Sequence, residues 1–233
     1  ILEIALLTNS NTPKKNINKE DFYNFQKNFL IKNKNFDLIK LFIEKNPNFY
    51  FKDDLINFYV DYYLAQANIE KSCEIFDTVG EVTVINDYTS KLKIYCLVNS
   101  NKIDKALMIY DLKKERGFKD KFFEKKIYNL IGFEGESNQI SDNNLLDLHL
   151  SHRVVTNFEY IPNENTPKEV WKYLASANLL ERIETIDLED IEKINLIEKA
   201  VHQGNYDEND LFSLYTRYQF NFNQLLSAKE NYK

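Results

Sequence analysis

Two cysteines, Cys73 and Cys96, carry the most informative chemistry in this sequence, because the chain of 233 residues contains these two and no others. Their spacing excludes a CxxC redox or zinc motif. A bridge between them would close a loop of about 23 residues, stabilise the fold by about 3 kcal/mol in the chain-entropy model, and indicate an oxidising compartment such as a periplasm. Two buried free thiols that pack as small apolar side chains are the other interpretation.

Histidine is the next residue type that could do chemistry. Of the three histidines, His149 and His152 stand at i, i+3, with Asp142 and Asp147 nearby. This spacing places two nitrogen ligands on one helix face, but a zinc site needs further ligands, and the sequence does not identify them. We therefore expect ordinary polar residues on a helix flank, with no metal and no cofactor.

Motifs for catalysis do not occur in this sequence. There is no G-x-S-x-G, no H-E-x-x-H and no glycine-rich phosphate loop, and five glycines leave little material for one. A nucleophile positioned against a histidine and an acid is also not identifiable. The sequence therefore predicts a protein that is not an enzyme.

The composition favours helices. Apolar residues make up 43% of the chain and charged residues 28%, whereas glycine and proline total only nine. An all-β protein of this length would need many more turn residues. No stretch approaches the roughly 18 apolar residues of a membrane-spanning helix, so we expect no such segment.

A repeat lies in the first half of the chain. Three segments align on Phe36, Ile69 and Ile103, at intervals of 33 and 34 residues, and apolar side chains recur 11 and 7 residues before and 7 residues after each of these positions. Such spacing is typical of two amphipathic helices joined by a short turn. The polar stretches KNKNF, AQANI and NSNKI supply the turns.

These segments resemble the tetratricopeptide (TPR) repeat family, whose period is also 34 residues. The resemblance covers about residues 20–117 and is carried by Ala106 and Tyr110 in IDKALMIY and by Ser72 and Phe76 in IEKSCEIF. It implies stacked antiparallel α-hairpins, an α-solenoid whose concave surface binds extended peptides or partner helices. The family's bulky and glycine positions in the first helix are not kept.

From this resemblance we expect a scaffold that binds a protein or peptide partner. Tyr59, Tyr88 and Tyr95 are the predicted contact residues. The net charge of −6 argues against a nucleic-acid partner. The cysteine pair slightly favours a periplasmic or envelope location over the cytoplasm.

The regular period ends near Gly117. We therefore expect a TPR-like region over residues 1–133 and a less regular α-helical region over residues 134–233 that continues or caps the array. Within the second region, residues 156–167 read as a linker or exposed loop. Thr166, Pro167 and Glu169 fit the N-cap, N1 and N3 positions of a capping box at a helix start.

Two alternatives stay open. The all-α array also resembles the U-shaped accessory region of soluble lytic transglycosylases, although the catalytic glutamate motif of that family is absent. The stretch KALMIYDLKKERGFKDKFFEKKIYNLI looks like one unit of the pentatricopeptide family, which implies RNA binding at one base per repeat.

Overall fold

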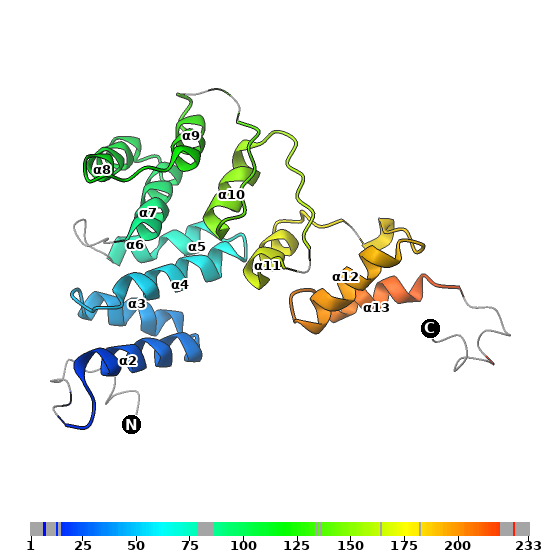
Figure 1. Ribbon diagram of the computed structural model, residues 1–233, viewed down its shortest axis with the longest axis horizontal. Helices are drawn as coiled ribbons and strands as arrows, with labels where there is room; N and C mark the ends of the chain where they lie inside the picture. The colour runs from blue at the N-terminus through cyan, green and yellow to red at the C-terminus, as the bar shows by residue number, and fades with distance from the viewer. Residues whose placement is uncertain are drawn as a thin grey trace. The chain divides into compact units, whose positions relative to one another are not determined.

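A computed structural model describes residues 15–78, 86–133, 135, 137–163, 165–181 and 183–219, together with residues 7, 13 and 226. All regular secondary structure in these residues is helical, which confirms the all-α prediction (Figure 1). No helix in this part of the chain is both long and apolar enough to cross a bilayer. The chain forms two compact units, residues 1–158 and residues 159–233.

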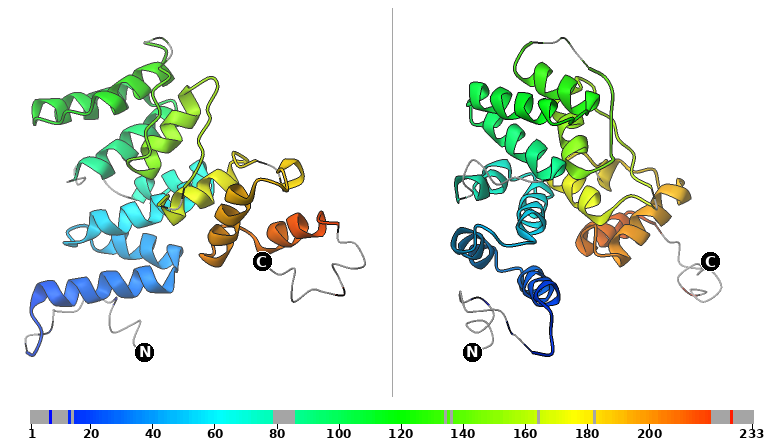
Figure 2. Two further views of the ribbon diagram at one scale, coloured as in Figure 1. Left: turned by 45° about the vertical axis from the view of Figure 1, so that its right-hand side comes forward. Right: turned by 60° about the vertical axis from the view of Figure 1, so that its left-hand side comes forward.

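The first unit contains helices α2 to α10. Figure 2 shows their arrangement from two further sides. Their bounds are α2 Lys19–Asn33, α3 Phe36–Lys45, α4 Lys52–Leu64, α5 Ile69–Cys73, α6 Ile75–Thr78, α7 Asp87–Asn99, α8 Ile103–Glu115, α9 Lys121–Leu130 and α10 Leu145–Val154.

Three of the connections share one backbone conformation. Lys34, Ala67 and Asn101 have φ angles of 49°, 53° and 58°, in the left-handed region that ends a helix and turns the chain. Helices α3, α5 and α8 each begin two residues later, at the three residues on which the sequence segments align. The polar turns predicted from the sequence are therefore present at these places.

Asparagine starts most of these helices. The side chains of Asn18, Asn35, Asn68, Asn86 and Asn144 each accept a hydrogen bond from the backbone N–H three residues further on. Each bond satisfies a donor that the first helical turn would otherwise leave without a partner. The high asparagine content thus has a structural role at the helix ends.

Helix α4 packs on α2, α3, α5 and α7, and α7 in turn packs on α8 and α9. Helix α10 packs on α4 and α9, which are far apart in the sequence. It also contacts α7, through Asp147 and His149. The face formed by α4, α7 and α9 is therefore covered by a helix of the same chain.

Helix α7 lies at the centre of the first unit. Every residue from Thr89 to Cys96 is buried, including Lys91 and Lys93. A helix that is buried all round needs neighbours on every side. The sequence predicted only one apolar stripe, through Leu92 and Cys96. Helix α10 adds contacts on another side of α7, where Asp147 and His149 contact Lys91 and Tyr95.

The compact units of the structure do not coincide with the two regions expected from the sequence. We predicted a division at residues 133/134, but the compact units divide at residues 158/159. The reason is that α10, although outside the regular period, packs on α4 and α9. The new boundary lies inside the linker predicted at residues 156–167.

The second unit has a small core of its own. Ile186, Ile194, Ile197 and Leu214 are buried together, and the Arg217 guanidinium donates a hydrogen bond of 2.7 Å to the Ile186 carbonyl. The elements are α11 Lys168–Ser176, the 3₁₀ helix η1 Ile183–Thr185, α12 Ile191–His202 and α13 Glu208–Thr216.

The predicted helix at residue 167 is present, but its capping box is not. Helix α11 has Pro167 at the N-cap position, without a side-chain cap. The Thr166 hydroxyl instead accepts a hydrogen bond of 2.8 Å from the backbone N–H of Asn163. Thr166 therefore closes the preceding turn, which takes its oxygen away from the helix.

Candidate functional site

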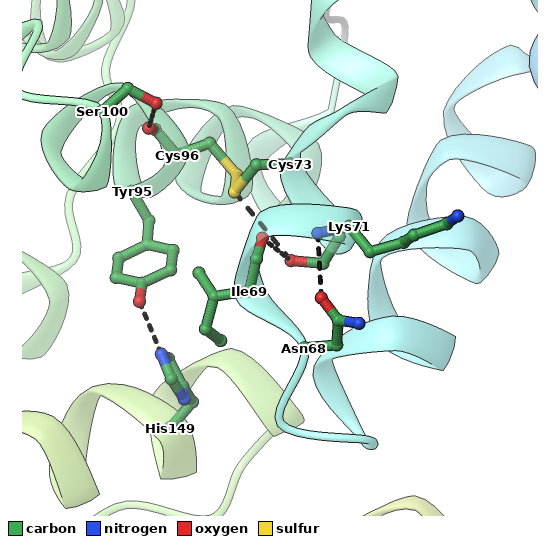
Figure 3. The surroundings of a disulfide bond; sticks show 9 residues. Asn68, Ile69, Lys71, Cys73, Tyr95, Cys96, Ser100 and His149 are labelled. Atoms are coloured by element: carbon green, nitrogen blue, oxygen red, sulfur yellow. Dashed lines mark hydrogen bonds between the residues drawn. A yellow bond between two sulfur atoms is a disulfide. The ribbon is translucent and has the colours of Figure 1, made fainter.

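Cys73 and Cys96 form a disulfide bond that joins α5 to α7, with their Cα atoms 5.5 Å apart (Figure 3). This decides between the two interpretations of the pair in favour of the bridge. Figure 3 also shows that neighbouring residues of α7 point to different partners. Cys96 reaches α5, whereas Tyr95 reaches His149 on α10.

The disulfide lines a groove of about 830 Å³ between α5–α6, α7 and α8. Much of its lining is apolar, which suits the burial of another apolar surface. The apolar side chains that line this groove are Phe76, Leu97, Met108, Ile109 and Leu112.

Helix α8 carries two apolar faces. Ala106 and Tyr110 are buried in the core of the first unit. Met108 and Leu112 lie on the groove side, and 55% and 46% of their respective surfaces are exposed. Together with Ile109 they follow the i, i+1, i+4 spacing of one helix face. The structure therefore leaves an apolar helical stripe without a covering element among the described residues.

The sequence analysis missed this second face, although the sequence contains its signal. In KALMIYDLKKER, Met108 and Leu112 are out of phase with Ala106 and Tyr110, so one α8 stripe cannot contain all four. Attention to aromatic residues favoured the tyrosines instead. A search for a second apolar period in the best-preserved repeat would have found the groove residues.

The predicted tyrosines do not form one open surface. Tyr59 and Tyr95 are each 2% exposed, and Tyr59 packs edge-on against the ring of Phe36, with ring centroids 5.8 Å apart. Tyr88 is half-buried, and its hydroxyl donates a hydrogen bond of 2.6 Å to Asp61. Neighbouring helices therefore cover Tyr59 and Tyr95, so neither ring is on the surface in this structure.

A buried ion cluster fastens α10 to the rest of the first unit. The Lys91 ammonium of α7 lies 2.9 Å from the carboxylate of Asp120 and 3.0 Å from that of Asp147. Asp120 caps α9, and Asp147 belongs to α10. Lys91 also lies over the Phe123 ring, 5.6 Å from its centroid. One side chain therefore joins α7, α9 and α10.

Tyr95 and His149 form a second buried contact between α7 and α10, with the hydroxyl oxygen 2.6 Å from the imidazole Nε2. Burial, together with the charges of Arg153 and His152, lowers the pKa of His149 to about 3. Burial raises the pKa of Tyr95 to about 12. Both groups are therefore neutral at pH 7, as suits a hydrogen bond in the core.

The two histidines of α10 do not act together. The His152 ring packs against Phe158, with ring centroids 5.3 Å apart, whereas His149 faces Tyr95. In the part of the chain that the structure describes, no group of three or more histidine, cysteine or acidic residues is placed to hold a metal ion.

A second hollow, of about 890 Å³, lies beside the loop between α8 and α9. Lys91 and Asp120 of the ion cluster line it, and so do the exposed Arg116 and Lys119. Lys113 and Arg116 line both hollows, so the two are neighbours. The mixed charges of the second hollow do not select one sign of ligand.

Apolar lining and an uncovered helix face make the groove between α5–α6, α7 and α8 the better candidate for binding. Comparison of the chain with family models, curated proteins and solved structures finds no match.

Proposed function

We propose that this chain is a non-enzymatic helical-repeat scaffold that binds a helical segment of a partner protein in the groove along α8. The observation that carries the proposal is the second apolar face of α8, where Met108 and Leu112 stay about half exposed inside a concave surface. Exposed apolar side chains gathered in a hollow mark interaction sites. An amphipathic helix in an apolar groove is a recurring mode of peptide recognition.

The recurrent turns support the repeat part of the proposal. Left-handed residues at positions 34, 67 and 101 precede helices that begin at equivalent sequence positions. Packing of α4 on α5 and of α7 on α8 is the pairing expected of successive α-hairpins. In this interpretation α10 covers the face that a solenoid would offer to its ligand, so the partner binds on the other side of α7.

The state of the buried polar groups supports a non-enzymatic role. Lys91 is held between two carboxylates, and His149 is buried against Tyr95. A general acid or base works best when its pKa lies near the working pH, whereas burial lowers the pKa of His149 to about 3. These groups are suited to holding helices together.

The disulfide supports an oxidising location such as the bacterial cell envelope. Structural disulfides persist in such compartments and are rare in reducing ones. An accessory role beside a cell-wall enzyme is compatible with this location. An RNA ligand fits less well, because the chain as a whole carries a net charge of −6.

A photo-crosslinking amino acid at position 112 tests the proposal in an extract of the native source. We expect a discrete protein adduct, because the side chain at position 112 lies in the groove. Leu41 of α3 is a matched control, since it is also a leucine on a helix and is 49% exposed.

The same crosslinker at position 41 should give no such adduct. Adducts of equal yield at both positions, or no protein adduct at position 112, would contradict the proposed function. The oxidised state of the disulfide is verified first by intact mass with and without reductant.

A further inference from the structure

The groove has two walls that differ in charge. The α5–α6 wall contributes three carboxylates, those of Glu70, Glu74 and Asp77. The opposite wall is basic, with cations at both ends of α8. The basic side chains on the α8 side are Lys102, Lys105, Lys113 and Arg116, and α7 contributes the buried Lys93.

Part of this charge is already neutralised inside the protein. Glu74 pairs with Lys40 at 3.4 Å, and Lys113 pairs with Asp87 at the same distance. Four other charges, two on each wall, are exposed and form no ion pair within the described residues. These are Glu70, Asp77, Lys102 and Arg116.

We propose that the groove selects an amphipathic helix of another protein with opposite charges on its two edges, acidic along α8 and basic along α5–α6. The inference rests on the proposed function and adds the chemistry of the partner. Lys102 and Arg116 attract acidic side chains on one edge of the bound helix, and Glu70 and Asp77 attract basic side chains on the other. The apolar face between the edges packs on Met108 and Leu112.

The dimensions set the length of the bound segment. Helix α8 has 13 residues, which is about 20 Å at 1.5 Å per residue. A bound helix of about 14 residues therefore reaches from Lys102 to Arg116. Apolar residues at i, i+3, i+4, i+7 and i+11 would give it one stripe along this distance.

A display library of 14-residue helical peptides tests the inference. The apolar stripe is fixed, and the positions on both edges vary among Glu, Lys and Gln. Binders are selected on the full chain with its disulfide intact, and peptides that also bind Leu112→Glu are removed. We expect the retained peptides to carry Glu on one edge and Lys on the other, and to bind about tenfold more tightly than peptides of like charge on both edges.

Two variants that change one wall at a time make the test independent of the direction in which the helix docks. Lys102→Glu with Arg116→Glu reverses the two unpaired charges of the α8 wall, so the edge along α8 should no longer select Glu. Glu70→Lys with Asp77→Lys makes both walls basic, and should select Glu on both edges. All four residues are exposed, so these changes leave the core intact.

The outcomes separate the two proposals. Groove-dependent peptides without a charge preference would overturn this inference and leave the proposed function standing. The absence of any peptide whose binding depends on Leu112 would overturn both. A dimer of the purified chain that Leu112→Glu dissociates would identify the occupant as a second copy, and would overturn the claim of a separate partner.

Discussion

A single ammonium group joins three helices of the first unit. Lys91 is 8% exposed at its side chain, and two carboxylates within about 3 Å hold its charge. Because the two acids belong to different elements, the cluster determines where α10 lies on the protein. One residue, Lys91, therefore helps to hold three helices together.

Replacement of this ammonium should be costly. We expect Lys91→Met to lower the free energy of unfolding by about 3–5 kcal/mol, since it leaves the carboxylates of Asp120 and Asp147 without their cation. Lys113→Met should cost at most about 1 kcal/mol, because its partner Asp87 is 67% exposed at its side chain. Urea unfolding measures the free energy of unfolding of both variants. An equal decrease in both would show that the ion cluster does not hold α10 in place.

His149 should make the protein acid-sensitive. Its pKa is about 3 in the folded protein and about 6.5 when the chain unfolds, so the unfolded state takes up the proton first as the pH falls. The contribution of neutral His149 to the free energy of unfolding is fully present above pH 6.5. It is lost as the pH falls from 6.5 to 3, at up to about 1.4 kcal/mol per pH unit.

The variant His149→Gln removes this titration and keeps a hydrogen-bonding group beside Tyr95. From about pH 7.5 to about pH 5.5, the wild type should lose about 1 kcal/mol more stability than this variant, as measured by urea unfolding. Tyr95→Phe should keep the wild-type slope, because the imidazole stays buried. If the free energy of unfolding fell with pH equally in the wild type and in His149→Gln, the acid sensitivity would not come from His149.

None of these residue contacts could be predicted from the sequence. Lys91 and Asp147 are 56 residues apart, and Tyr95 and His149 are 54 residues apart. Local periodicity contains no information on such pairs. The cysteine pair differs, since two cysteines leave only one pairing within the chain.

At the scale of the elements, the sequence predicted helix ends correctly where neighbouring residues determine them. The starts of α3, α5 and α8 follow from asparagine-rich turns and from apolar spacing, both of which are readable within a few residues. The interruption between α5 and α6 at Glu74 was not predicted, because IEKSCEIF reads as one helix and contains no glycine or proline.

Ala67 occupies a left-handed turn position that disfavours a side chain, with φ of 53°. Ala67→Gly should therefore stabilise the protein by about 0.5–1 kcal/mol, since glycine adopts this conformation without the steric cost. Ala65→Gly, at φ of −61° and buried, should destabilise it by about 1 kcal/mol. Thermal unfolding measures whether each variant is more or less stable than the wild type. If both were less stable, the left-handed conformation of Ala67 would not carry a steric cost.

At the scale of the molecule, the first unit extends beyond the regular repeat. The sequence predicted that the period ends near residue 117, but it contained no signal that α10 would return to α4 and α9. Contacts between distant segments decide where a compact unit ends. The end of the first compact unit lies inside the linker predicted at residues 156–167, whereas the expected division at residues 133/134 marks the end of the regular repeat and stays a prediction.

Limited proteolysis distinguishes the two boundaries. Ile161 is 85% exposed between the units, so a protease that cuts beside large apolar residues should cleave there and release a fragment that contains the disulfide. A cut at the exposed Phe133 should not separate the pieces, because α10 remains packed on α4 and α9. Size exclusion after digestion would reject the 158/159 boundary if cleavage at Phe133 alone released α10.

We propose that α8 presents a binding face through Met108 and Leu112. The most direct measurement is the affinity of the tightest helical peptide from the library for the wild type, Leu112→Glu and Leu41→Glu, by fluorescence anisotropy. A buried charge in the groove should weaken binding at least tenfold in Leu112→Glu, whereas Leu41→Glu should bind like the wild type. Equal affinities in all three proteins would show that the groove is not the binding site.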